Sequence, residues 1–311
     1  MTMPQEFIGV DIAKDWIDVH TLSTRQDARI MTTQQALAGF AEMAAGAFVV
    51  FEASGVYTRP LSQALDKEGI SYACVNPRQA RDFARSTGKL AKTDRLDAQV
   101  LAQMGRALNL RPTPPAEPDR VRLADLVARR GDLVAMIGAE KNRAKQAQHA
   151  WIGTEIAGLL KVLNDHLQQI ESQIEALIDS RKPLAEASQR LRSMTGVGPA
   201  LGAAILARLP ELGTLDRRQI ASLAGLAPHA CESGQHRGKR RIWGGRAEVR
   251  RSLSLAAFIA SRHDPRFKAC RTRLQTAGKP VKLALTACAR KLLTILNAMV
   301  RDKTDCLKSN L

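Results

Sequence analysis

The chain has 311 residues, of which 45% are hydrophobic, and its 47 Lys and Arg residues against 30 Asp and Glu give a formal net charge of +17. This length favours two or three domains, and the positive charge favours a polyanionic partner, with nucleic acid as the first candidate. We find no N-terminal signal pattern and no apolar run of about 18 residues, so we expect a cytoplasmic protein without membrane contact. The five cysteines form no CxxC pair, which fits reduced thiols.

The first 110 residues predict a mixed α/β domain. Residues 5–11 and 15–22 have the apolar and β-branched composition of a strand hairpin, and the continuous apolar run at 47–53 is typical of a strand buried on both faces. Helical and extended segments then alternate, which indicates βαβ crossovers. The segments are a helix at 57–68, a strand at 70–75, and helices at 77–86 and 92–106.

A proline cluster at 112–118 marks a domain boundary, because neither a helix nor a central strand tolerates that density. We therefore expect a linker and long helices over 111–190. Within them, apolar residues alternate four and three apart, which is a heptad seam. The seam consists of Ile156, Leu160, Leu163, Leu167, Ile170, Ile174 and Leu177. Packing inside the chain and an intermolecular coiled coil explain it equally well, so a dimer is one of two alternatives.

Residues 191–311 predict a mostly helical third domain. Near its start, Gly196 and Gly198 precede Pro199 and an Ala/Leu-rich helix, so the turn could leave helix N-terminal amides open to a phosphate. This pattern resembles a helix-hairpin-helix element that binds nucleic acid. An ordinary glycine-containing connection between helices is the alternative.

Four acidic residues are candidate metal ligands in the first domain. Asp11 ends the first strand, Glu52 ends the buried strand, and Asp94 and Asp97 share one face of the helix that follows. Carboxylate oxygens suit Mg²⁺ or Mn²⁺, and two such ions can stabilise the attacking and leaving oxygens of a phosphoryl displacement. Taken singly, Asp11 could cap a turn, and the Asp94–Asp97 pair could be a solvated helix start.

The segment 229–251 carries seven Lys and Arg residues against two Glu, a density that favours phosphate contact. Ser233 lies near its start, and as a nucleophile it would need activation by a base, a metal or a lowered pKa. On composition alone, a turn serine is the simpler interpretation. The candidate nucleic-acid contacts here are Arg237, Lys239, Arg240, Arg241, Arg246, Arg250 and Arg251.

These blocks together resemble the DEDD-type insertion-sequence transposases related to the Piv invertase, a family described as bridge-RNA-guided serine recombinases. The resemblance spans nearly the whole chain. It lies in FIGVDIAK at 7–14, EASGVY at 52–57, KTDRLDA at 92–98, TGVGP at 195–199, AGLAP at 224–228 and ESG at 232–234.

The resemblance implies an RNase H-like (RuvC-like) domain at 1–110, a coiled-coil segment within 111–190 and a transposase domain at 191–311. It implies that Asp11, Glu52, Asp94 and Asp97 hold Mg²⁺ and that Ser233 attacks DNA to form a phosphoserine link. It further implies a noncoding guide RNA that pairs with donor and target DNA, tetramers built from dimers with composite active sites, and a nucleoid-associated protein of bacterial type.

One departure from the family pattern follows Ile242, where Trp243-Gly244-Gly245 stands in place of the frequent Ser-Lys or Gly-Lys pair. Arg246, Arg250 and Arg251 could supply the missing basic contact. Two rival functions remain at this point. One is a metal-dependent junction nuclease that uses water and the four acids, and the other is a non-catalytic RNA- or DNA-binding protein.

Overall fold

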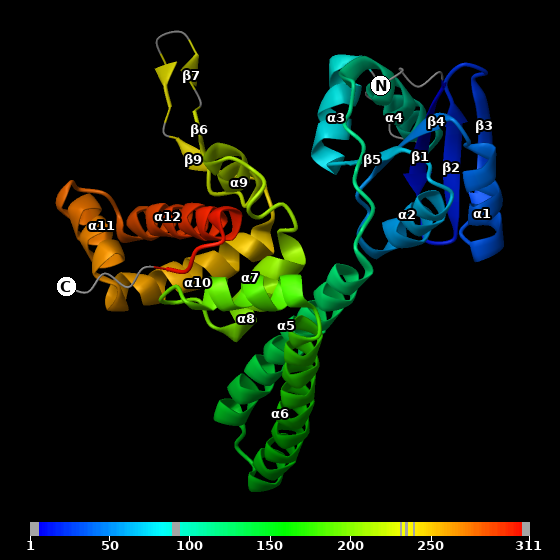
Figure 1. The fold of residues 1–311 in the computed structure, drawn as a ribbon. Helices are drawn as coiled ribbons and strands as arrows, with labels where there is room; N and C mark the ends of the chain where they lie inside the picture. The colour runs from blue at the N-terminus through cyan, green and yellow to red at the C-terminus, as the bar shows by residue number, and fades with distance from the viewer. Residues whose placement is uncertain (1–5, 89–93, 231, 234–235, 239, 307–311) are drawn as a thin grey trace. The chain divides into compact units, whose positions relative to one another are not determined.

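The computed structural model describes residues 6–88, 94–230, 232–233, 236–238 and 240–306 (Figure 1). The side chains of Asp94, Arg95, Glu232, Ser233, His236 and Arg237 are also outside this description. The chain forms two compact units, residues 1–116 and 117–311. The three-part division at 110 and 190 stays a prediction, since the long helices share a compact unit with the C-terminal ones.

The first unit is built on a five-stranded sheet with the order β3-β2-β1-β4-β5. β1 (Glu6–Ile12), β2 (Trp16–Thr21) and β3 (Gln26–Met31) form an antiparallel meander, and β4 (Ala47–Glu52) and β5 (Tyr72–Val75) extend it in parallel from β1. The mixed α/β class predicted from the sequence is confirmed, and this strand order is consistent with an RNase H-like domain.

Helices cover both faces of the sheet, as the alternation of side chains along each strand requires. Ile8, Val10 and Phe51 share a core with α1 (Gln34–Met43) and α2 (Thr58–Lys67), which follows the short helix η1 (Gly55–Tyr57). On the opposite face, Phe48 and Val50 share a core with α3 (Pro77–Ser86) and α4 (Asp94–Leu108).

The second unit is helical. In chain order its helices are α5 (Pro118–Gln146), α6 (Ala150–Asp179), α7 (Lys182–Arg192), α8 (Pro199–Arg208), α9 (Arg217–Leu223), α10 (Ala247–His263), α11 (Pro265–Thr276) and α12 (Val281–Asp302). Two small ribbons lie between α9 and α10: β6 (Pro228–His229) pairs with β9 (Arg241–Ile242), and β7 (Glu232–Ser233) pairs with β8 (His236–Arg237). One apolar core joins the N-terminal part of α5 and the C-terminal part of α6 to the helices from α7 to α12.

The heptad seam of α6 faces α5 of the same chain, and Figure 1 shows the two helices side by side. Ile156, Ile174 and Leu177 on the seam are buried, as are Leu133 and Ile137 on α5. Packing inside the chain, one of the two alternatives for the seam, is therefore what the structure shows. An intermolecular coiled coil stays a prediction.

The turn before α8 needs glycine for a packing reason. Gly196 has φ +91°, and a Cβ added to it would lie 2.7 Å from the carbonyl oxygen of Ala256 in α10. The turn therefore allows α10 to approach closely. Whether this element acts as a helix-hairpin-helix stays a prediction.

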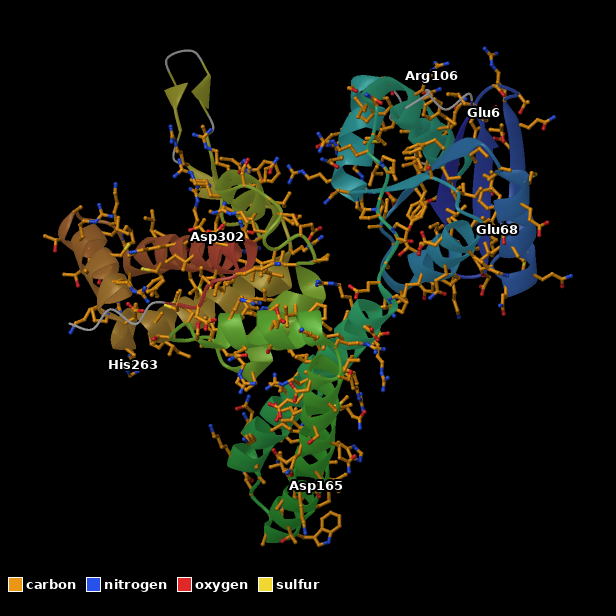
Figure 2. All side chains as sticks on the ribbon, in the orientation of Figure 1. Glu6, Glu68, Arg106, Asp165, His263 and Asp302 are labelled. Atoms are coloured by element: carbon orange, nitrogen blue, oxygen red, sulfur yellow. The ribbon has the colours of Figure 1, made fainter. Side chains whose placement is uncertain are left out.

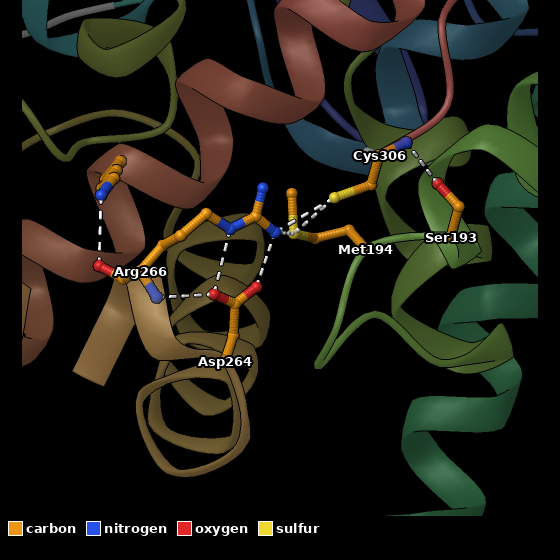
Figure 3. Close-up of polar contacts among 6 residues, drawn as sticks. Ser193, Met194, Asp264, Arg266 and Cys306 are labelled. Atoms are coloured by element: carbon orange, nitrogen blue, oxygen red, sulfur yellow. Dashed lines mark hydrogen bonds and ion pairs between the residues drawn. The ribbon is translucent and has the colours of Figure 1, made fainter. Parts of the chain in front are cut away.

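The segment after α12, at Cys306, is held by a polar network around the buried carboxylate of Asp264 (Figure 3). Asp264, 4% exposed, caps α11 by accepting from the Arg266 N–H and receives two hydrogen bonds from the Arg266 guanidinium. The same guanidinium contacts the Cys306 Sγ at 3.1 Å, and the Cys306 N–H donates to the Ser193 hydroxyl at 2.9 Å. These bonds connect the end of α10, the end of α7 and the chain's C-terminal segment.

Among the described residues, one helix, α12, is long and apolar enough by length and composition alone to cross a membrane. Its 22 residues include an 18-residue window with a mean hydropathy of 1.4. Leu292, Leu293 and Leu296 of this helix are fully buried in the core of the second unit. Its apolar character therefore has a packing explanation, because these side chains form part of the core of the second unit.

Candidate active site and nucleic-acid interface

The ends of β1 and β4 place Asp11 and Glu52 next to each other. The strands are parallel, and Val10 pairs with Phe51, so Asp11 and Glu52 are the next residues in the same register. Because side chains alternate between the two faces of a strand, Asp11 lies on the same face of the sheet as Gly9, and Glu52 lies on the same face as Val50. Because neighbouring strands lie about 4.8 Å apart, the two positions are adjacent, and both side chains are partly buried.

Helix α4 lies directly on this face. A Cβ added to Gly9 would be 1.9 Å from the Ala98 carbonyl oxygen, and one added to Gly105 would be 3.0 Å from the Phe7 ring. These contacts show that α4 runs antiparallel to β1. The first turn of α4, which contains Asp94 and Asp97, is therefore at the end of β1 where Asp11 lies.

The helical periodicity of α4 places Asp94 above β1 and Asp97 above the neighbouring strand β4. Asp94 precedes Ala98 by one turn, so it shares the stripe of α4 that contacts β1. Asp97 precedes Leu101 by one turn, and Leu101 packs with Phe48 of β4. The backbone thus brings all four predicted acidic positions to one end of the sheet.

The chemistry of this set suits a hard divalent cation, because its donors are carboxylate oxygens. Among the described residues, no group of three or more His, Cys, Asp or Glu is placed to hold a metal ion. The side chain of Asp94 is not among the described residues. Ser54, two residues after Glu52, has a buried hydroxyl that makes no hydrogen bond. Metal binding by the four acids stays a prediction.

A fifth carboxylate, Asp18, lies on the same face and was not identified from the sequence. It is directly opposite Asp11 in the β1–β2 register and is 5% exposed. Arg29 of β3 donates to both of its oxygens at 2.9 Å, and its guanidinium lies 4.7 Å from the Trp16 ring centre. The sequence WIDVHT contained a signal for it. Ile17 and Val19 alternate onto the core face of β2, so Asp18 between them must lie on the opposite face, which Asp11 shares.

We expect Arg29→Gln to destabilise the first unit by about 1–3 kcal/mol, because it leaves the buried Asp18 carboxylate without its ion pair. Arg29 is itself about half exposed, so solvent reduces the loss and the lower part of this range is expected. Urea denaturation measures the change. Arg81→Gln, an exposed site on α3, is the control, and an Arg29 variant as stable as this control would contradict the expectation.

The serine-bearing strand β7 and its partner β8 lie in the chain between the strands of a second two-stranded ribbon of the same length, β6–β9. Ser233 of β7 pairs with His236 of β8, and His229 of β6 pairs with Arg241 of β9. The rings of His229 and Trp243 lie 4.8 Å apart and pack together at the β6–β9 ribbon, which we call the stem. Figure 1 shows the β7 strand extending away from the helices of its unit. Lys239 and the side chains of Ser233 and Arg237 lie outside the described residues.

Arg246 and Arg250 anchor the base of this segment. The Arg246 guanidinium donates to both oxygens of Glu211 at 2.7 Å and to the Arg208 carbonyl at 2.6 Å. Arg250 donates to the Gly244 carbonyl at 2.7 Å. By contrast, the side chains of Arg240, Arg241 and Arg251 are exposed. Phosphate contact by any of the seven cations stays a prediction.

The Trp243-Gly244-Gly245 departure has a structural reason. Gly244 and Gly245 have φ values of +69° and +64°, and a Cβ on Gly245 would lie 2.2 Å from the Gly225 backbone nitrogen. Both positions therefore favour glycine. The segment is held against the end of α9 by direct backbone contact.

The Glu211–Arg246 pair makes stability depend on pH. Burial alone would raise the pKa of Glu211, but the hydrogen bonds and charge of Arg246 outweigh it and hold the pKa below 4.5. A lowered folded-state pKa gives stability that is present above the unfolded value and is lost as pH falls through the folded value.

We therefore expect Arg246→Gln to reduce the unfolding free energy of the second unit at neutral pH and to weaken its decline below pH 4.5. Urea titrations at several pH values measure this difference. Arg251→Gln, an exposed site on the same helix, should follow the unmodified chain. Equal pH profiles for the Arg246 variant and the unmodified chain would refute the assignment.

The N-terminus of α8 opens on a cavity of 610 Å³ between α5, α6 and α7. Gly198 lines it together with Arg130 and Arg192, and α6 contributes three acids, Glu171, Glu175 and Asp179. Arg130 is paired with Glu171 at 2.7 Å. The acidic lining opposes a bound phosphate, so nucleic-acid contact by Gly196 and Gly198 stays a prediction.

Comparisons with known proteins agree on one family over both units. A model of DEDD transposases of the IS110 group, described as "Transposase", matches residues 8–148. A second, described as "Transposase IS116/IS110/IS902 family", matches residues 188–272.

Curated relatives give the same result. The chain is 27% identical to the pilin gene-inverting protein of Moraxella bovis over 316 residues, covering 96% of this chain and 97% of that protein. The Moraxella lacunata protein of the same name is equally similar. The 43.6 kDa protein of insertion element IS110 from Streptomyces coelicolor is 34% identical over 48% of this chain and 36% of its own length.

Proposed function

Because this chain belongs to the IS110 family of DEDD transposases, which are recombinases acting on DNA, we propose that it moves an insertion sequence by cutting and rejoining DNA strands through a covalent serine intermediate. The observation that supports this most directly is the register of β1 and β4. It aligns Asp11 with Glu52 beneath the first turn of α4, where Asp94 and Asp97 lie.

In this proposal, the Ser233 hydroxyl attacks a backbone phosphorus, an oxygen–phosphorus bond forms to serine, and the deoxyribose oxygen leaves and takes up a proton. A second strand's hydroxyl then attacks the phosphoserine and releases Ser233. Two such transesterifications conserve the phosphodiester, so no nucleotide cofactor is consumed. The hairpin of β7 and β8 presents the serine, and the surrounding cations hold the strand by its phosphates.

Asp11, Glu52, Asp94 and Asp97 would hold Mg²⁺ or Mn²⁺, which would polarise the phosphate and stabilise the attacking and leaving oxygens. Carboxylates from two strand ends and one helix are a suitable donor set because hard cations prefer oxygen ligands. The Arg29–Asp18 pair beside them would keep Asp18 occupied. The four acids would then act without competition from the fifth.

We further propose that a noncoding RNA pairs with donor and target DNA and that the active form is a homo-oligomer, a dimer or a tetramer, in which Ser233 of one subunit meets the acids of another. The family resemblance supports both statements. Delegating sequence choice to base pairing leaves the protein to recognise backbone and shape. The cation-rich composition of the chain suits that task.

The deciding experiment is a reconstitution. The protein is purified with RNA transcribed from its own element, then mixed with donor and target DNA and Mg²⁺, and any joined product is sequenced. We expect precise strand joining that requires Mg²⁺, the RNA and Asp11, with Asp11→Asn as the inactive control. Cleaved ends without joining would favour a water-using nuclease instead, and binding without any strand change would favour a non-catalytic protein.

A further inference from the structure

A cation-lined pocket lies at the corner between α10 and α11, away from the serine hairpin. It has a volume of 300 Å³ and is lined by Ser261, Arg262, Lys268, Arg271, Thr272 and Gln275. His263, the last residue of α10, is labelled in Figure 2 and marks this corner. All six lining side chains end in hydrogen-bonding groups, and three of them are cationic.

No acid lines this pocket. Residues 249–301 contain twelve Lys and Arg but a single acid, Asp264. That acid is occupied, because Arg266 donates to both of its oxygens and the α11 backbone uses it as a cap. Throughout the described part of the chain, no carboxylate forms an ion pair with Arg262, Lys268 or Arg271. Three neighbouring cations without a counter-charge repel one another, so an anion would stabilise the corner.

The donors of the pocket are held in place but incompletely used. The Nε of Arg271 is buried and makes no hydrogen bond, and its other contact is a long one, 3.4 Å from Nη1 to the Ser261 hydroxyl. Arg262 stacks over the Phe258 ring at 4.4 Å, which fixes its guanidinium at the rim. A buried donor without a partner is costly, so Arg271 has hydrogen-bonding capacity that its contacts within the chain leave unused.

We propose that this pocket binds a backbone phosphate of the DNA on which the enzyme acts. Guanidinium groups match the geometry of phosphate oxygens, and Thr272 and Gln275 can donate to the same oxygens, whereas the Ser261 hydroxyl already donates to the Phe258 carbonyl at 2.8 Å. A phosphodiester supplies the missing negative charge, and the excess of cations along α10, α11 and α12 would attract the rest of the strand. The inference rests on the proposed function only for the identity of the polyanion.

The test is equilibrium binding to a short random-sequence DNA duplex, without Mg²⁺, over a series of KCl concentrations. Each phosphate contact contributes about 0.9 to the slope of log K against log salt. Arg262→Gln and Arg271→Gln should each weaken binding at every sequence tested and lower that slope by up to about 0.9. Arg273→Gln, an exposed arginine of α11 outside the pocket lining, is the matched control and should retain the slope.

Folding is checked by circular dichroism. If the Arg271 variant fails to fold, the Arg262 variant still tests the proposal, because Arg262 is exposed and its loss should not disturb the core. Slopes equal to that of the control for both variants would overturn the proposal. So would a thermal stabilisation by inorganic phosphate that depends on Arg271 while DNA binding does not, since the pocket would then hold a free anion. A slope change seen with RNA duplex alone would also reject DNA as the ligand. Because the assay involves no strand transfer, failure here is separate from failure of the recombinase chemistry.

Discussion

Ser233→Ala should abolish the covalent protein–DNA adduct and reduce strand joining by on the order of 10³-fold or more. The change removes one oxygen atom, the only group at this position that can bond to phosphorus. Binding to DNA should remain, because the cations of the 237–251 segment and the stem contacts at His229 and Trp243 are unchanged. The adduct is measured by denaturing electrophoresis of labelled DNA after trapping.

Two further variants make this result specific. Ser222→Ala changes an exposed serine of α9 near the stem and should keep full adduct formation. Asp11→Asn should prevent adduct formation without touching the serine, because the acids are proposed to act in the same step. An adduct that survives in the Ser233 variant would reject the serine mechanism, and water-dependent cleavage in its place would favour the nuclease alternative.

Gly9→Ala should destabilise the first unit by about 3 kcal/mol, at the upper end of the usual cost of overpacking, and should also remove recombination. The new methyl carbon would lie 1.9 Å from the Ala98 carbonyl oxygen and 2.5 Å from the Ala102 nitrogen, both of them backbone atoms. Backbone atoms cannot relieve the overlap by changing rotamer as a side chain can, so the whole of α4 must move away from β1. The first turn of α4 would then move away from Asp11 and Glu52.

Gly39→Ala is the control for the loss of glycine itself. Gly39 lies inside α1, and a Cβ there meets nothing within 4 Å, so the change should be neutral or stabilise by up to about 1 kcal/mol. Urea denaturation and the joining assay are measured on both variants. Normal stability and joining in the Gly9 variant would show that α4 does not lie on β1 as described.

Local patterns predicted much of the first unit. The apolar run that ends in Glu52 is the central strand β4, and the paired segments before it are β1 and β2. β3 was not predicted because it is an edge strand with mostly exposed residues and no apolar alternation. Asp18 was missed for a related reason, since its importance depends on the residue across the sheet and not on its own neighbours in the chain.

The second unit shows a different limit of sequence reasoning. A heptad seam reports that α6 packs against a helix but does not identify which one, and α5 of the same chain satisfies it. Likewise, the composition of the basic segment 229–251 could not distinguish arginines that pair with acids of the chain from arginines that are exposed. Arg246 is neutralised by Glu211, 35 residues earlier, through a contact that only the folded chain brings together.

The Arg29–Asp18 pair has a consequence for electroneutrality. Five carboxylates at one end of the sheet would carry five negative charges, and Arg29 cancels one of them through two hydrogen bonds. A carboxylate engaged in this way is a poor ligand for a divalent cation, because both of its oxygens already accept from a guanidinium. Loss of Arg29 would therefore add a fifth oxygen donor beside the four proposed ligands, so we expect the number or kind of bound cations to change.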